Sequence, residues 1–119
     1  MFGFNNKVNN KVNKEREARK ERNALEAQQS KFEIWSKWCN SEEHKLMYHL
    51  KTLIIKTYAT VGIKADIIGE RISDEFTRAD LIEDFAIFFD PKVFYKLKVW
   101  CREYEALCKE EDKIIEELE

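Results

Sequence analysis

Apolar residues recur at helical spacing along most of the chain, most clearly over residues 91–118. One column of positions alternates steps of four and three, with Glu111 as its single polar member, and a second column beside it repeats every seven residues. A face that covers three of every seven positions is typical of a helix in a bundle and wider than the seam of a two-stranded coiled coil. The two columns comprise Val93, Leu97, Trp100, Tyr104, Leu107, Glu111, Ile114 and Leu118, and Phe94, Cys101, Cys108 and Ile115.

This C-terminal helix is long for so short a chain. Its 28 residues span about 42 Å at the helical rise, whereas a compact domain of 119 residues is about 35 Å across. We expect the far end of the helix to need cover from the N-terminal helix or from a second subunit. The expected oligomer contacts are Leu107, Ile114, Ile115 and Leu118.

A second helix is predicted to start after Asn40 and Ser41, because a capping side chain is followed three residues later by Glu43. Met47, Leu50, Ile54, Tyr58 and Val61 then follow at steps of three and four, and Gly62 is the expected stop.

Further signals divide the segment between these two helices. Residues 63–72 are ambiguous between helix and loop, and we predict a short helix there. Thr77 and Asp80 form a second capping pattern before an apolar face that includes Phe85. Asp90 and Pro91 supply an N-cap and a first-turn proline for the last helix.

The N-terminal segment differs from the rest. Residues 1–13 repeat the letters NNKV and predict a flexible, basic, Asn/Lys-rich arm, and residues 14–119 predict one helical domain. Leu25, Phe32 and Cys39 recur at sevens in the helix that follows the arm. Three glycines and one proline are too few for the turns of a sandwich or barrel. The predicted fold is therefore an all-α bundle of four or five helices.

Charge is distributed unevenly. Residues 1–31 carry eight Lys/Arg against four Glu, and residues 101–119 carry three against eight acidic side chains. We expect the basic end to pack antiparallel against the acidic end, within one chain or across a dimer. The net charge of -2 argues against a general nucleic-acid coat, but the basic end could contact phosphates. The candidate phosphate contacts are Lys7, Lys11, Lys14, Arg16, Arg19, Lys20 and Arg22.

Cysteine content and hydropathy bear on the compartment. Three cysteines without CxxC spacing indicate a reduced, cytoplasmic protein, and no apolar stretch reaches the length of a membrane span. Lysine outnumbers arginine 15 to 6, which is typical of an A/T-rich coding sequence and hints at a phage or mobile element.

No pattern for catalysis, metal binding or cofactor binding is present in the sequence. His44 and His49 are five residues apart and do not share a helix face with Cys39 in the way a metal site needs. Nucleotide-binding fingerprints are missing from the sequence, so neither a cofactor nor a metal is expected, and the chain is not expected to be an enzyme. Ala65 and Gly69 have the spacing of a helix-turn-helix, but Glu75 stands where that motif needs an apolar residue.

Aromatic residues are the strongest candidates for binding. Trp35, Trp38, Trp100 and Tyr104 are either core residues or contacts with a partner, because Trp and Tyr dominate interface hot spots. The sequence therefore predicts a non-catalytic protein-binding protein, such as an adaptor, assembly factor or inhibitor of a host or defence protein. A nucleic-acid-associated protein and a self-assembling homo-oligomer are the alternatives.

Overall fold

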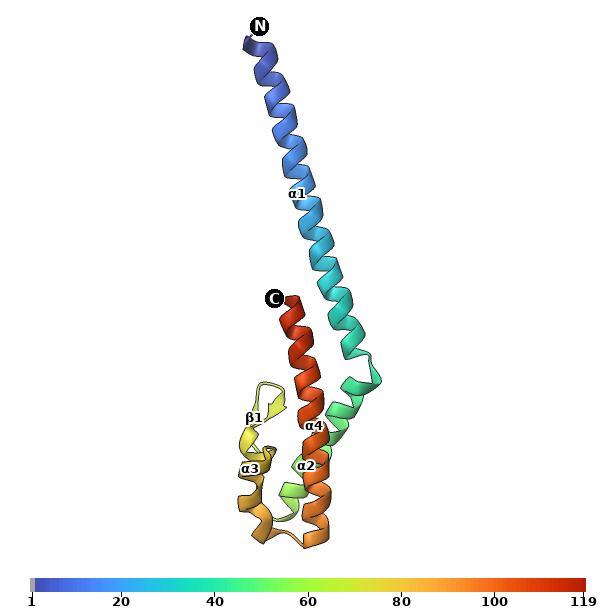
Figure 1. The fold of residues 1–119 in the computed structure, drawn as a ribbon, viewed down its shortest axis with the longest axis vertical. Coiled ribbons are helices and arrows are strands. Elements are labelled where there is room, and N and C mark those ends of the chain that lie inside the picture. Colours follow the sequence, from blue (N-terminus) through green and yellow to red (C-terminus); the bar gives the residue numbers. More distant parts are fainter. Residues whose placement is uncertain (1) are drawn as a thin grey trace. The chain divides into compact units, whose positions relative to one another are not determined.

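The computed structural model describes the backbone of residues 2–119 and the side chains from residue 11 onward. The chain is mostly helical, as predicted, with one small two-stranded sheet (Figure 1). Its elements are α1 (Phe2–Cys39), α2 (Glu42–Thr60), β1 (Ile67–Ile68), β2 (Arg71–Ile72), η1 (Asp74–Phe76), α3 (Ala79–Ile82), η2 (Glu83–Phe88) and α4 (Pro91–Leu118). None of the helices in the described chain is both long and apolar enough to cross a membrane.

The chain divides into two compact units, Met1–Ser36 and Lys37–Glu119. The first unit is the greater part of α1. The predicted arm at residues 1–13 falls on α1, which begins at Phe2, and its flexibility stays a prediction because the side chains of residues 1–10 lie outside the described ones. The boundary at residue 13 and the four- or five-helix bundle likewise stay predictions.

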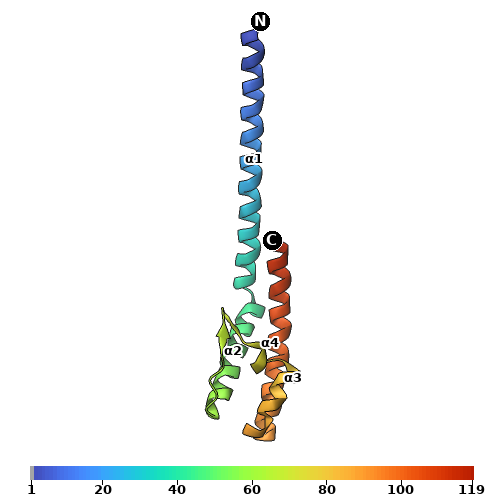
Figure 2. The ribbon, with the colours of Figure 1, turned by 90° about the vertical axis from the view of Figure 1, so that its left-hand side faces the viewer.

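The core of the second unit lies between α2 and α4, which pack side by side (Figure 2). Ile54 and Tyr58 of α2 and Leu97 of α4 are completely buried. Full burial of such side chains contributes about 1.5–3 kcal/mol each. Tyr58 also donates a hydrogen bond to the carbonyl of Phe76 at 2.7 Å, so the phenol satisfies its polar atom inside the core.

Both ends of α2 follow local signals in the sequence. The helix begins after Ser41, whose hydroxyl accepts a hydrogen bond from the amide of His44. The predicted start is confirmed, but the N-cap is Ser41 and the third helical residue is a histidine, so the expected capping box with Glu43 does not form. Gly62 stops the helix as predicted, with φ +77°.

The hydrogen bonds at this end of α2 form a Schellman motif. The amide of Gly62 donates to the carbonyl of Ala59, and that of Ile63 donates to the carbonyl of Tyr58. A residue with positive φ is needed at this point of the motif, which glycine adopts without steric cost.

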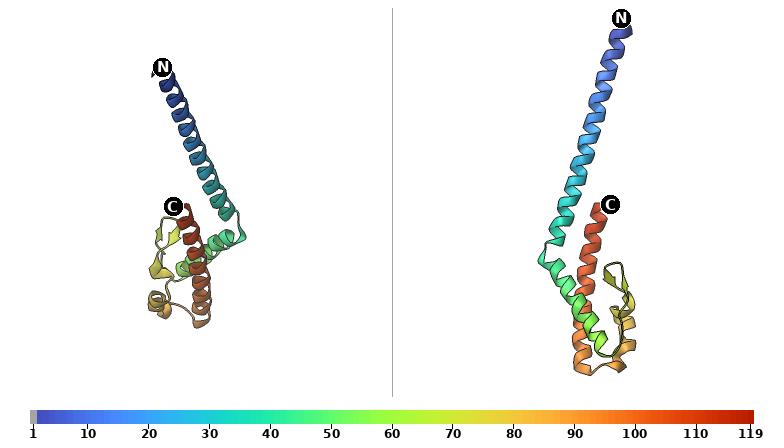
Figure 3. Two further views of the ribbon diagram at one scale, coloured as in Figure 1. Left: turned by 45° about the horizontal axis from the view of Figure 1, so that its top comes forward. Right: turned by 180° about the vertical axis from the view of Figure 1, so that it is seen from behind.

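The short helix expected at residues 63–72 is wrong. Residues 67–72 form an antiparallel hairpin in which Ile67 pairs with Ile72. Gly69 has φ +65°, and a glycine with positive φ at the first position of a two-residue turn suits a type II′ hairpin. The hairpin lies beside the C-terminal half of α4 in both views of Figure 3.

The segment before α4 also differs from its prediction. Arg78, rather than Thr77, is the N-cap of α3, and it caps without a side-chain hydrogen bond. α3 is a single turn that continues as the 3-10 helix η2. Phe85 is half-buried and stacks on Phe76 with ring centroids 5.5 Å apart, so the expected apolar face is only partly buried.

The start of α4 is confirmed. The carboxylate of Asp90 accepts a hydrogen bond from the amide of Lys92 at 2.9 Å, and Pro91 occupies the first turn. This local cap fixes where α4 begins. The two predicted apolar columns are buried in part, since Val93 is 40% exposed. Their buried members are Phe94, Leu97, Cys101, Tyr104, Leu107 and Glu111.

Candidate functional site

The described side chains of α1 in the first unit are largely exposed to solvent. Every side chain from residue 11 to residue 34 is exposed, including Leu25 at 64% and Phe32 at 71%. These two residues are seven apart, which is close to two helical turns, so they lie on one side of α1. Large apolar side chains exposed in this way are candidates for contact with another molecule.

The candidate phosphate contacts lie on the same helix. Lys7 is outside the described side chains. The other six are exposed, and none of them takes part in an ion pair in the portion of the chain whose side chains are described. They are Lys11, Lys14, Arg16, Arg19, Lys20 and Arg22.

A buried polar network lies in the second unit. The indole Nε1–H of Trp38 donates to Oε2 of Glu111 at 3.0 Å, and Nη2 of Arg71 donates to Oε1 of Glu111 at 2.8 Å. Arg71 also pairs with Asp112 at 2.9 Å and donates to the carbonyl of Cys108 at 3.2 Å. This network ties the end of α1 and the hairpin to one point on α4.

The network explains how a carboxylate can be buried there. Glu111 is only 9% exposed, and a buried carboxylate is tolerated when it is paired and hydrogen-bonded. Burial by itself lowers the pKa of Arg71, but its hydrogen bonds to Glu111 and Asp112 outweigh that effect and raise the pKa. Arg71 therefore stays charged, and the pair is a fixed structural contact.

Two of the candidate binding aromatics have partners inside this unit. Trp38 is 6% exposed and bonded to Glu111. Tyr104 is buried, and its hydroxyl accepts a hydrogen bond from the amide of Ile72 at 3.2 Å. Trp35 and Trp100 are half-buried and keep part of their surface accessible. Core packing, the alternative role for these aromatics, therefore applies to Trp38 and Tyr104.

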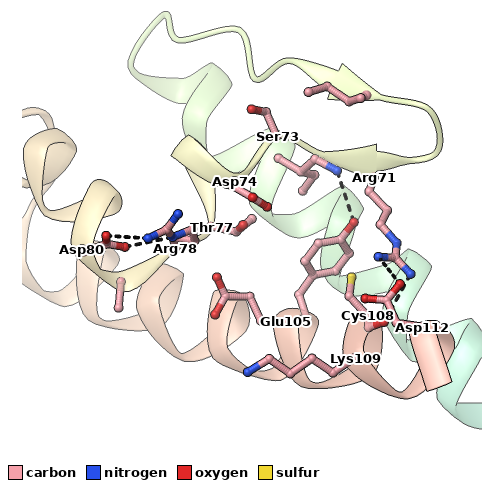
Figure 4. Close-up of a pocket in the computed structure, with 14 residues that line it drawn as sticks. Arg71, Ser73, Asp74, Thr77, Arg78, Asp80, Glu105, Cys108, Lys109 and Asp112 are labelled. Carbon is pink, nitrogen blue, oxygen red and sulfur yellow. Dashed lines mark hydrogen bonds and ion pairs between the residues drawn. The ribbon is translucent and has the colours of Figure 1, made fainter.

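A pocket of about 690 Å³ opens between α4 on one side and the hairpin, η1 and α3 on the other (Figure 4). Its size falls within the range of small-molecule sites. Many of its charged groups are already paired: Arg78 makes a two-pronged contact with Asp80 at 2.8 and 3.1 Å, and Arg71 holds Asp112.

Glu105 and Asp74 approach the pocket from opposite walls (Figure 4). Burial raises the pKa of Glu105, the positive charge of Lys109 opposes that effect, and the nearby carboxylate of Asp74 adds to it. The charged form of Glu105 is therefore disfavoured at the pocket wall. No histidine is among the residues that line the pocket.

The cysteines of α4 are shielded rather than activated. Burial raises the pKa of the Cys101 thiol to about 12. The pKa of Cys108, which lines the pocket, is also raised by burial, although a hydrogen bond from Tyr104 and the charge of Arg71 oppose the shift. Nucleophilic cysteines have a depressed pKa, so the shifts run opposite to what that chemistry needs.

The histidines do not come together. The His44 ring makes edge contacts with Trp38 and Tyr48, with centroids 5.7 and 4.8 Å away, and His49 is exposed. The described residues contain no group of three or more His, Cys, Asp or Glu placed to hold a metal ion.

The candidate oligomer contacts fall into two groups. Leu107 is buried inside the second unit, whereas Ile114, Ile115 and Leu118 are half-buried at the end of α4. The last three therefore keep apolar surface that is accessible to a second subunit.

The roles of Glu111 and Arg71 were not predicted from the sequence. Glu111 was visible as the one polar member of an apolar column, which is the signal of a buried charge that needs partners. The partners are 40 and 73 residues away in the sequence, so the pattern alone did not identify them.

Comparisons of the chain with protein-family models, curated proteins and solved structures found no match in any of the three.

Proposed function

We propose that this protein acts by binding another protein without catalysis, and that α1 supplies the contact surface. The observation that carries the proposal is the exposure of Leu25 and Phe32 on one side of a helix whose described side chains are exposed throughout residues 11–34. Long helices in water owe most of their stability to packing of an apolar face. A partner that covers this side of α1 supplies that packing.

The proposal includes the architecture. The bundle of four or five helices that the sequence predicts for this chain is kept as part of the proposal. Within this class we favour an adaptor, assembly factor or inhibitor encoded by a phage or mobile element, on the grounds of small size and lysine-rich composition. The three free cysteines fit a reducing compartment such as the cytoplasm.

The test compares two variants of α1 that add the same charge on different sides. Leu25→Glu with Phe32→Glu alters the apolar side. Asn23→Glu with Ser30→Glu alters exposed positions two residues earlier, which is about 200° around the helix. Tagged proteins are used to capture partners from a nuclease-treated lysate of the source organism, and the retained proteins are identified by mass spectrometry.

We expect the natural chain and the Asn23/Ser30 variant to retain the same protein in stoichiometric amount, and the Leu25/Phe32 variant to lose it. Equal retention by both variants would show that the apolar side of α1 is not the contact surface. Circular dichroism of both variants checks that their helices are intact.

A second candidate function is binding of nucleic acid by the same helix. It is favoured by the six exposed basic residues at 11–22, none of which forms an ion pair in the described chain. Binding that depends on phosphate contacts weakens with salt at a log–log slope of about -0.9 per contact on duplex DNA. Fluorescence anisotropy with duplex DNA, with and without Arg16→Glu and Arg19→Glu, separates this function from a protein interface, which changes little with salt.

A further inference from the structure

The basic segment of α1, residues 11–22, carries positive charge that no ion pair among the described side chains offsets. It holds six Lys/Arg and three Glu, all exposed. Every ion pair among the residues with described side chains lies between Glu42 and Asp112, so the segment keeps its net charge of +3. Such a surface attracts a partner of opposite charge.

The acidic segment of α4, residues 110–119, carries the opposite charge. Glu111 and Asp112 both pair with Arg71, whose single positive charge offsets only one of them, and Lys113 adds one positive charge to the segment. The remaining carboxylates are exposed at the C-terminal end of a helix whose last turn has no basic residue. The helix dipole makes that end unfavourable for anions, so a cationic neighbour stabilises it. These carboxylates are Glu110, Glu116, Glu117 and Glu119.

Apolar residues accompany the charges on both helices. Leu25 follows the basic segment by three residues and is mostly exposed. Ile114, Ile115 and Leu118 lie within the acidic segment and are half-buried. When the two charged segments are aligned antiparallel, Ile114 and Leu118 fall near Ala18 and Val12 of α1, and Leu25 lies beyond the acidic segment. The two helix dipoles then lie in opposition, which favours the pairing.

From these observations we propose that the basic segment of α1 docks antiparallel on the acidic segment of α4 in a second copy of this chain. The inference rests on the proposed function, since it names the partner of α1. The two contacts in such a pair are equivalent by a twofold axis, so the assembly closes as a dimer. Two copies of α1 and two of α4 then form four long helices.

Helix lengths favour a second copy over the same chain. The hydrogen bond between Trp38 and Glu111 gives both helices a common reference point. Lys14 lies about 36 Å from Trp38 along α1, whereas α4 and its cap extend only about 12 Å past Glu111. In a second copy, α4 is not tied to Trp38 of the first chain. Its acidic segment can therefore align with the basic segment along its length.

The experiment uses three variants of the full chain. The basic-reversed variant carries Arg16→Glu and Arg19→Glu, the acidic-reversed variant carries Glu116→Lys and Glu117→Lys, and a control carries two charge reversals elsewhere, Glu75→Lys and Asp84→Lys. All six positions are exposed, so the fold of the second unit is preserved. Sedimentation equilibrium measures the dimer dissociation constant at low and at high salt.

We expect the natural chain and the control to be dimers at low salt, with dissociation constants that rise when salt shortens the range of the charges. Each reversed variant alone is expected to dimerise at least ~10-fold more weakly, because like charges then face each other. A mixture of the two reversed variants restores the dimer, because both contacts again join opposite charges.

Three results would overturn the inference: a natural chain that stays monomeric, a dimer that tolerates both reversals, or a mixture that does not restore the dimer. The last result would mean that the two segments do not face each other across the dimer, since mixing restores every contact in which they do. A monomeric chain that still retains a different protein through Leu25 and Phe32 would remove this inference and leave the proposed function standing.

Discussion

Trp38 and Glu111 are 73 residues apart in the sequence and joined by a hydrogen bond of 3.0 Å, in which the indole donates to a carboxylate that is almost fully buried. The same carboxylate receives the guanidinium of Arg71. Three segments of the chain therefore depend on one side chain. This arrangement makes Glu111 the most informative position at which to test the structure.

Replacing Glu111 by alanine is expected to lower the free energy of unfolding by about 2 kcal/mol. The change leaves the indole N–H of Trp38 without its acceptor and removes one of the two carboxylates that pair with Arg71. A buried group that loses its partner costs about 1–3 kcal/mol or more. The partial exposure of Arg71 keeps the cost at the lower part of that range. Urea denaturation followed by circular dichroism measures it.

Glu110→Ala is the matched control, because it removes an exposed carboxylate from the neighbouring position of the same helix. Its effect is expected to stay within about 0.5 kcal/mol. A double-mutant cycle with Trp38→Phe is expected to give a coupling energy of about 1 kcal/mol. Additive effects of Trp38→Phe and Glu111→Ala would contradict the hydrogen bond.

The ends of α2 and the start of α4 could be predicted because their signals are local. Ser41 and Gly62 bracket α2, and Asp90 with Pro91 begins α4, so each boundary is set by groups within a few residues of the backbone that they cap. The buried column of α4 was predicted for a similar reason, since its period is contained in one segment.

The hairpin could not be predicted because its stability comes from distant residues. Each strand has two residues, which is too short for a recognisable alternation. Its second strand is held by two hydrogen bonds to α4. The amide of Ile72 donates to the hydroxyl of Tyr104, and the guanidinium of Arg71 donates to the carboxylate of Glu111. For the same reason the sequence indicated that Trp38 and Tyr104 were either core or contact residues but could not decide between the two roles.

Gly62→Ala is expected to destabilise the protein by about 1 kcal/mol. Gly62 has φ +77°, and a side chain at that angle is strained even though nothing lies within 4 Å of the added Cβ. Gly62→Asn is expected to cost less, since asparagine tolerates this conformation better. Lys64→Ala, at an exposed position two residues later, serves as the control in thermal denaturation, and an equal loss in all three would argue against the strained cap.

Cys101 is expected to resist alkylation in the folded protein. Burial raises its pKa to about 12, so at about pH 8 only about one thiol in ten thousand is ionised, and the thiolate is the reactive form. Cys39 is half-buried and more accessible. With iodoacetamide and mass spectrometry, Cys39 should be labelled first and all three cysteines should be labelled in urea. Rapid labelling of Cys101 in the folded chain would be inconsistent with its place in the core.

Glu105→Gln is expected to raise the free energy of unfolding near neutral pH. Burial raises the native-state pKa of Glu105, and the carboxylate of Asp74 adds to the shift. A raised pKa means that the folded state holds the proton more tightly than the unfolded state. The stability associated with the proton is therefore present below the unfolded pKa and is lost as pH rises through the native pKa. Glutamine stays neutral and avoids that loss.

The advantage of the Glu105→Gln variant should disappear at acidic pH, where Glu105 is protonated in both states. Urea denaturation at about pH 3 and about pH 7 measures the difference at each end. Glu103→Gln, at an exposed position of the same helix, controls for the loss of one negative charge and should show no comparable gain. A variant that is less stable than the natural chain at neutral pH would mean that the charged carboxylate of Glu105 makes a favourable contact at the pocket wall.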